Sequence, residues 1–222
     1  MAAERRPRVK ICGITRLEDA LLAVDLGATA LGFVFWPSSP RFIAPGRALG
    51  IVEQLPALVM TVGVFVNQPL ESIEAVSSQL SLRVVQLHGS EAPAFCAAVT
   101  IPVIKAIAVA DADADAALDV ARRYPGATLL LDAHDPVRVG GTGRTIDWTV
   151  AERLGRERHV FLSGGLTPEN VREAVAVARP YGVDVSSGVE SAPGIKSPER
   201  LRALFAAVDA IGEFPASGEE RR

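Results

Sequence analysis

Two side chains that can transfer protons stand at the ends of short, largely apolar segments. Cys12 closes the segment VKIC and is followed at once by Gly13, and Asp132 follows three leucines in TLLLDAHDP. A thiolate and a carboxyl group are both suited to acid–base chemistry. Each residue also has a plainer interpretation, because a terminal aspartate often caps a turn and a small cysteine can fill space beside a glycine.

The period of two along a β-strand predicts which side chains accompany the thiol. Lys10 shares a face with Cys12, whereas the apolar Val9 and Ile11 share the opposite face. We expect the apolar pair to meet covering helices and Cys12 to point toward a binding site. Lys10 would then lie one layer deeper on the same side.

Two glycine-containing segments later in the chain suit an anion. They read Ser163-Gly164-Gly165 and Ser186-Ser187-Gly188. Glycines there let backbone N–H groups approach a phosphate without obstruction by a Cβ atom. Val189 and Glu190 could begin a short helix that adds a favourable N-terminus, before the break at Pro193-Gly194. Ordinary turn chemistry is the alternative.

A strand followed by a helix recurs along the chain and would position these groups. The first unit is a strand at residues 8–12 and a helix that opens with Thr15 and Glu18 as a capping box. Similar strands are indicated at ALGFVFW, TVGVFV, RVVQL, VIKAIAV, TLLLD, HVFLSGG and VDVSSG. Ser197 caps and Pro198 opens the final helix. About eight such units predict an α/β protein, a closed (β/α)₈ TIM barrel, with an open doubly wound sheet as the alternative.

A barrel of this kind would bring the candidate residues to one end. Ligands lie at the carboxyl ends of the strands, so Cys12 on the first strand and Asp132 on the sixth would face each other roughly across the mouth. The glycine segments follow the seventh and eighth strands, where barrels frequently bind phosphate. Gln86 and His88 share the inward face of the fourth strand. We expect one domain over residues 1–222, with tails 1–7 and 213–222 that fray.

Composition narrows the classes of partner. The 222 residues carry a formal net charge of −3, so no basic face favours nucleic acid. No apolar run is long enough for a membrane helix, and the first residues do not resemble a secretory signal. These features predict a cytoplasmic protein that binds small molecules. Cys12 and Cys96 are too few for a disulfide framework, and Cys96 shares a helical face with apolar residues, which favours packing.

No pattern in the sequence predicts a metal site or a cofactor. His88, His134 and His159 belong to different strand–helix units and show no ligand spacing. The run DADADA at residues 111–116 resembles the start of a calcium loop but lacks the glycine and glutamate that such a loop requires. We therefore expect chemistry carried out by side chains alone.

Ordered motifs resemble the phosphoribosylanthranilate isomerase family of tryptophan biosynthesis. They are KICGIT (10–15), GFVFWPSSPRFI (32–43), VGVFVN (62–67), VQLHG (85–89), LLLD (129–132), GGTGRTIDW (140–148), LSGGLTPENV (162–171) and VDVSSGVE (183–190). The order of the whole set makes the resemblance specific. It implies an Amadori rearrangement of N-(5-phosphoribosyl)anthranilate to a 1-deoxyribulose 5-phosphate aminoketose, without a cofactor.

The resemblance also assigns roles to individual residues. Asp132 matches the family's acid, which protonates the ring oxygen, and Cys12 matches the base, which removes the proton from C2′. Both pKa values should then be displaced, with Lys10 or helix dipoles favouring the thiolate and desolvation raising the pKa of Asp132. Arg41 matches the arginine that engages the anthranilate, since a guanidinium can grip a carboxylate with two hydrogen bonds.

The remaining site residues keep alternatives open. Asp184 could hydrogen-bond a substrate hydroxyl or pair with Lys10 as a buried ion pair. Gln86 and His88 would line the wall of the site. The segment 133–145 carries three glycines and would suit a mobile loop that closes over substrate.

Two other functions compete with this interpretation. One is the aminoaldose isomerase of histidine biosynthesis, whose family resembles a two-carboxylate design with an acid where this chain has Cys12. The other is a phosphometabolite-binding barrel without catalysis, which the presence of both Cys12 and Asp132 disfavours. We expect a phosphosugar ligand and either a monomer or a homodimer.

Overall fold

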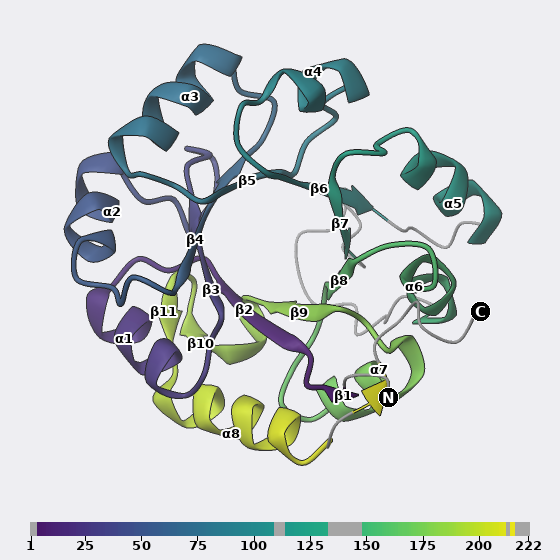
Figure 1. The fold of residues 1–222 in the computed structure, drawn as a ribbon. Coiled ribbons are helices and arrows are strands. Elements are labelled where there is room, and N and C mark those ends of the chain that lie inside the picture. Colours follow the sequence, from purple (N-terminus) through teal and green to yellow (C-terminus); the bar gives the residue numbers. More distant parts are fainter. Residues whose placement is uncertain (1–3, 109–113, 133–147, 212–213, 216–222) are drawn as a thin grey trace.

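Eight parallel strands close into a barrel in the computed structural model, which describes residues 4–108, 114–132, 148–211 and 214–215 (Figure 1). The strands are β2 (Arg8–Cys12), β3 (Ala30–Val34), β4 (Met60–Phe65), β5 (Val84–Leu87), β6 (Val103–Ala108), β7 (Thr128–Asp132), β8 (Val160–Ser163) and β9 (Gly182–Val185). Each pairs with the next in sequence, and β9 pairs with β2 to close the ring. The predicted barrel is confirmed, and the open sheet is excluded.

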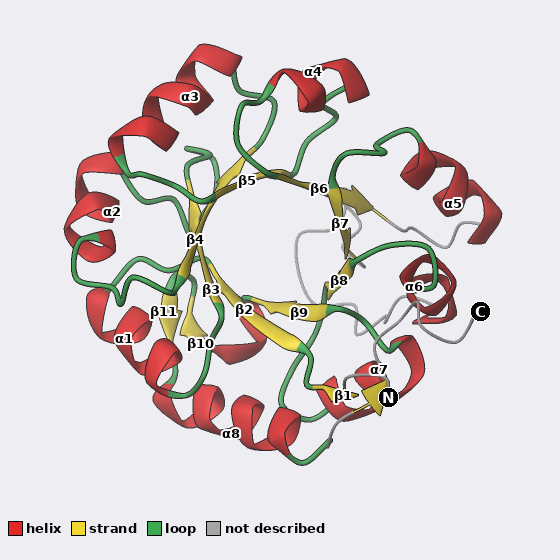
Figure 2. Ribbon diagram, viewed as in Figure 1, coloured by secondary structure: helices red, strands yellow, loops and turns green. Residues whose placement is uncertain are grey.

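Helices form a ring around the strands (Figure 2). They are α1 (Leu17–Asp25), α2 (Pro45–Val52), α3 (Leu70–Gln79), α4 (Pro93–Ala98), α5 (Ala114–Arg122), α6 (Trp148–Gly155), α7 (Val171–Ala178) and α8 (Pro198–Asp209). Each follows one barrel strand, as a right-handed parallel connection requires. Within the described parts of the chain, no helix is long and apolar enough to cross a membrane.

Alternation along the strands separates two layers of core. Val9, Ile11 and Leu131 pack in the larger cluster between the strands and the helices. Ala30, Val62 and other inward residues fill the barrel interior. Both faces of each strand are therefore covered, which explains why the strands read as nearly continuous apolar runs.

Of the two predicted helix N-caps, one is present in the structure and the other is not. Ser197 caps α8 as predicted, because its hydroxyl accepts a hydrogen bond from the backbone N–H of Arg200 at 3.3 Å. The capping box at the start of α1 is wrong. The Thr15 hydroxyl instead donates to the carbonyl of Gly194, and the residue before α1, Arg16, makes no side-chain cap. A tertiary contact has taken the hydroxyl from the local motif.

The segment after β9 also departs from its prediction. A short 3-10 turn covers Ser187–Val189, and Glu190 begins a strand rather than continuing a helix. This strand, β10 (Glu190–Ala192), pairs antiparallel with β11 (Ile195–Lys196). The intervening Gly194 adopts a φ of +77°, which favours glycine and allows the tight reversal.

Parts of both tails lie beside each other. Strand β1 (Glu4–Arg5) pairs antiparallel with β12 (Phe214–Pro215). These two strands belong to the tails 1–7 and 213–222, which the sequence predicts to fray. Residues 1–3, 212–213 and 216–222 lie outside the described residues, as does the whole of the glycine-rich segment 133–145. The proposal that this segment closes over substrate therefore stays a prediction.

Candidate active site

Cys12 ends β2 with its side chain on the inward face of the barrel. It packs with Val34 and Val64 at the carboxyl end of the strands, and only 8% of the residue is exposed. Lys10 lies two residues deeper on the same face and is fully buried. The predicted orientation of this strand is confirmed.

Gly32 on the neighbouring strand makes room for the thiol. A Cβ atom placed on Gly32 would lie 2.8 Å from the Cys12 sulfur and 3.2 Å from Nζ of Lys10. The first of these separations is shorter than real Cβ contacts. Gly32 therefore leaves space for the Cys12 thiol, a role that the alternation of residues along the strand does not reveal.

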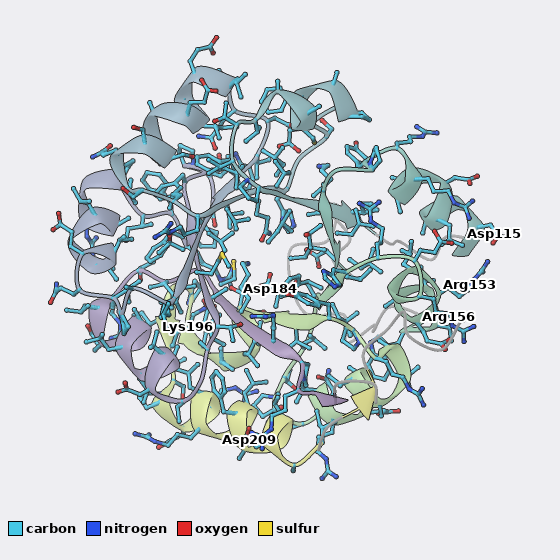
Figure 3. The ribbon with its side chains drawn as sticks, viewed as in Figure 1. Asp115, Arg153, Arg156, Asp184, Lys196 and Asp209 are labelled. Carbon is cyan, nitrogen blue, oxygen red and sulfur yellow. The ribbon has the colours of Figure 1, made fainter. Side chains whose placement is uncertain are left out.

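Lys10 forms a buried ion pair with Asp184. Their register on β2 and β9 places them directly opposite, and Nζ of Lys10 donates to Oδ1 of Asp184 at 2.7 Å. Burial alone would lower the pKa of Lys10, but Asp184 and Cys12 outweigh it and the net pKa is raised. Of the two alternatives for Asp184, the structure contains the ion pair, and Figure 3 shows this residue beside the barrel interior.

The thiol of Cys12 is held mainly in its neutral form. Burial is the largest influence and raises the pKa, while the ammonium groups of Lys10 and Lys196 lower it and Asp184 raises it. Lys10 does lower the pKa of the Cys12 thiol, as expected. The effect of burial is larger than the effect of Lys10, because the buried sulfur has lost most of its water. The net pKa is therefore raised, and the predicted lowering is wrong for the free protein.

Asp132 is connected to Gln86 through the ring of His88. Nε2 of His88 lies 3.0 Å from Oδ2 of Asp132, and Nδ1 lies 2.8 Å from Nε2 of Gln86. Gln86 is buried on β5, and His88 follows the same strand. The predicted inward face of this strand is confirmed, and it reaches the end of β7 across the intervening β6.

This chain of three groups can accommodate Asp132 in either protonation state. When the Gln86 amide donates to Nδ1, the His88 ring offers an Nε2–H to an ionised Asp132. When the amide is rotated, its oxygen accepts an Nδ1–H, and Nε2 accepts a proton from a neutral Asp132. Oε1 of Gln86 is buried and has no hydrogen-bond partner among the described residues. A general acid requires the second arrangement.

The second predicted phosphate segment lies against the backbone that directly follows the first. Gly164 and Gly165 have φ angles of +85° and +64°. A Cβ atom on Gly188 would lie 1.8 Å from the carbonyl oxygen of Leu166, so only glycine permits this approach. The Ser186 hydroxyl donates to the carbonyl of Cys12 at 3.1 Å, which links the second segment to the end of β2. The Ser187 backbone begins the 3-10 turn in the same segment.

Arg41 reaches over the first loop toward the same end of the barrel. A Cβ atom on Gly13 would lie 2.6 Å from Cδ of Arg41, so the glycine allows the arginine to lie against the backbone. Nε and Nη2 of Arg41 bind the carboxylate of Glu190 at 2.9 and 2.7 Å. The guanidinium is therefore already oriented by a carboxylate of the protein.

A family model described as N-(5'phosphoribosyl)anthranilate (PRA) isomerase matches residues 9–207. The chain belongs to this isomerase family. A curated PRA isomerase from Geobacter metallireducens is 52% identical over 195 residues, which cover 88% of this chain and 95% of the relative.

Solved structures of PRA isomerases agree over nearly the same span. The enzyme from Thermotoga maritima superposes with a TM-score of 0.86 at 45% identity, covering 92% of this chain and 99% of that one. A second PRA isomerase, solved in complex with reduced 1-(o-carboxyphenylamino)-1-deoxyribulose 5-phosphate, gives a TM-score of 0.81 at 43% identity, covering 92% of this chain and 99% of that one. The fold expected from the family resemblance is thus shown.

Two charged residues of this barrel, Glu190 and Lys196, were not predicted to belong to the site. Glu190 orients Arg41, and Lys196 binds both Glu190 and the carbonyl of Cys12. Burial alone would raise the pKa of Glu190, but Arg41 and Lys196 outweigh it and the net pKa is lowered. No spacing rule marks these residues, because Arg41 and Cys12, which they bind, lie far away in the sequence.

The described residues contain no group of three or more His, Cys, Asp or Glu side chains that could hold a metal ion. His88 is engaged with Gln86 and Asp132, and the ring of His159 stacks on Tyr181 with centroids 4.0 Å apart. This end of the barrel carries a thiol and a carboxyl group, two side chains that are chemically capable of proton transfer. The thiol and the carboxyl group belong to strands three positions apart around the ring, with the glycine segments between them.

Proposed function

We propose that this chain isomerises N-(5-phosphoribosyl)anthranilate to 1-(2-carboxyphenylamino)-1-deoxy-D-ribulose 5-phosphate, an aldose–ketose step of tryptophan biosynthesis. Cys12 acts as the general base and Asp132 as the general acid. The observation that carries the proposal is the placement of these two residues at the carboxyl ends of β2 and β7, in a chain of the PRA isomerase family. Catalytic groups lie at this end in essentially every barrel of this type.

The reaction requires two proton transfers at different edges of the sugar. Asp132 donates its proton to the ring oxygen as the bond between that oxygen and C1′ breaks, which leaves a Schiff base. The thiolate of Cys12 removes the proton from C2′, and the electrons of that C–H bond form an enol-amine. Transfer of a proton to C1′ and loss of the hydroxyl proton then give the ketone. Groups on separate strands suit this division of labour.

The other residues bind the two ends of the substrate. The phosphate lies on Gly164, Gly165, Ser186, Ser187 and Gly188, whose backbones are brought together at the ends of β8 and β9. Arg41 binds the anthranilate carboxylate, His88 and Gln86 hold Asp132, and Asp184 together with Lys10 supports the base. The ligand is a phosphosugar, and we expect a cytoplasmic monomer or homodimer with neither nucleic acid nor membrane as partner.

A fluorescence assay of phosphoribosylanthranilate consumption tests the activity. The purified chain should turn over this substrate and should leave the aminoaldose of the histidine pathway unchanged, because Cys12 stands where that family has an acid. Turnover of the histidine-pathway substrate alone would favour the related isomerase instead. Binding of both substrates without turnover would favour a non-catalytic barrel.

A further inference from the structure

Lys196 on β11 is fully buried beside the end of β2. Its Nζ donates to the carbonyl of Cys12 at 2.6 Å, to Oε1 of Glu190 at 2.8 Å and to the carbonyl of Ser186 at 3.3 Å. An ammonium group has three N–H bonds, so every donor has an acceptor. One side chain therefore connects the last residue of β2, the second glycine segment and a buried carboxylate.

Glu190 continues this connection to Arg41. Its two oxygens receive Nε and Nη2 of Arg41 in a fork geometry, while Oε1 also accepts from Lys196. The backbone N–H of Gly194 donates to the same oxygen at 3.2 Å. Because the Glu190 side chain is only 5% exposed, this carboxylate is fixed on all sides rather than solvated.

The hairpin that carries both charges is anchored to the first helix. The backbone N–H of Lys196 donates to Oδ2 of Asp19 on α1 at 3.0 Å, and Arg16 grips the same carboxylate through Nε and Nη2. Figure 1 shows β10 and β11 outside the ring of strands, on the side of α1 and α8. Lys196 thus has a fixed backbone as well as a fixed ammonium group.

A second buried lysine provides a contrast. Lys105 on β6 pairs with Glu91 at 2.7 Å and donates to backbone carbonyls of Leu87 and Gly89. Its side chain is 3% exposed, close to the 0% of Lys196. It belongs to the outer layer of β6 and influences Cys96, not Cys12. Both lysines are buried, but Lys196 lowers the pKa of Cys12 whereas Lys105 lowers the pKa of Cys96.

We propose that Lys196 is a positioning residue that couples the base to the carboxylate-binding arginine. It holds the Cys12 backbone directly and orients Arg41 through Glu190, so that the base and the group that binds the anthranilate carboxylate are fixed relative to each other. This inference deepens the proposed function and rests on it. A solely structural ion pair would stabilise the fold without coupling these two groups.

The charge of Lys196 also bears on the thiol. The charged groups that act on the Cys12 thiol are Lys10 on β2, Asp184 on β9 and Lys196 on β11. Lys196 pairs with Glu190 on β10, which in turn binds Arg41 in the loop after β3. This linked set contains three cations and two carboxylates, so formation of the thiolate balances its charge. Lys196 lowers the pKa of Cys12 in this arrangement, although burial raises it more.

Alkylation of the two cysteines, followed separately by peptide mass spectrometry over a range of pH, tests the local effect. Lys196→Met should raise the midpoint of Cys12 alkylation by about one pH unit and leave Cys96 unchanged. Lys105→Met is the matched control and should raise the midpoint of Cys96 while leaving Cys12 unchanged. A folded Lys196→Met variant with the wild-type Cys12 midpoint would overturn the proposal.

Steady-state kinetics test the coupling to Arg41. Glu190→Gln should raise KM about tenfold with kcat changed less than about threefold, because Arg41 loses its oriented partner. Lys196→Met should lower kcat and raise KM together. Should Lys196→Met fail to fold, the double variant Glu190→Gln/Lys196→Met removes the buried pair as a unit, which is less destabilising than removing one partner.

The double variant separates positioning from stability. The proposal requires the raised Cys12 midpoint and the raised KM to persist after thermal stability has returned. Recovery of midpoint, kcat and KM together with stability would show a purely structural pair and overturn it. If the wild-type chain fails to isomerise phosphoribosylanthranilate, the proposed function fails, whereas the alkylation midpoints still report directly on Lys196 and Cys12.

Discussion

The two sides of the barrel mouth surround their proton-transfer groups differently. Cys12 lies next to the buried pair of Lys10 and Asp184, and Lys196 holds its carbonyl. Asp132 instead meets an imidazole, which is joined in turn to an amide. Among the described contacts, the Cys12 side, here called the base side, contains paired full charges, and the Asp132 side, here called the acid side, contains a chain of groups that can remain neutral.

This difference suits the opposite demands on the two groups. In the proposed mechanism Cys12 becomes an anion at a buried position, so nearby ammonium groups are needed to oppose the rise in pKa caused by burial. In the same proposed mechanism Asp132 carries a proton, and a full positive charge beside it would favour the carboxylate. The Gln86–His88 chain lets the acid lose and regain its proton without that bias.

The largest expected effect comes from removing either proton-transfer group. Cys12→Ala and Asp132→Asn should each lower turnover about 100- to 10,000-fold, the range usual for one acid or base. Affinity for a non-reacting product analogue should change far less, because the phosphate segments and Arg41 remain. Steady-state assays and calorimetric titration measure the two quantities. Near wild-type turnover in either variant would remove that residue from the mechanism.

The next effect tests whether paired charges on the base side also hold the fold. Lys10→Met leaves Asp184 buried without its partner and should lower the free energy of unfolding by about 3–5 kcal/mol. Lys10→Met/Asp184→Asn should recover much of this loss, since no uncompensated charge then remains. Urea denaturation measures both. Equal losses in the single and double variants would mean that the pair contributes little as a pair.

The sequence predicts much of this molecule because local rules survive in the fold. Alternation placed Lys10 and Cys12 on the inward face of β2, and the Ser197 cap of α8 is confirmed. The capping box at Thr15 failed because a carbonyl about 180 residues away, that of Gly194, takes the hydroxyl. Local motifs hold where tertiary partners do not compete for the same atom.

The supporting charges of the site could not be predicted in the same way. Lys196 and Cys12 are 184 residues apart, and Arg41 and Glu190 are 149 apart. Their contacts depend on the closure of the barrel and on a hairpin that replaced an expected helix. The proposed catalytic roles came from motifs, whereas the residues that hold these side chains in place can be recognised only in the folded chain.

A smaller effect probes the acid side. Gln86→Leu keeps the volume and removes the amide, which leaves Nδ1 of His88 without this partner. Loss of one buried hydrogen bond of about 1–2 kcal/mol should lower kcat roughly 5- to 30-fold through a less well-held Asp132. The Cys12 alkylation midpoint should not move. A shifted midpoint would show that the acid side and the base side are electrostatically coupled and do not act independently.

The smallest effect concerns stability at alkaline pH. The pKa of the Cys12 thiol is raised in the folded state, so its stabilising contribution is complete below the ordinary thiol pKa of about 8.5 and is lost as pH rises through the folded value. Cys12→Ala should therefore flatten the alkaline fall in the free energy of unfolding by up to about 1.4 kcal/mol per pH unit, whereas Asp132→Asn should leave the slope unchanged. Urea denaturation between about pH 8 and pH 10 measures these slopes. Identical slopes in all three proteins would mean that Lys10 and Lys196 cancel the effect of burial, and that the base side controls the charge of its thiol as fully as it controls its position.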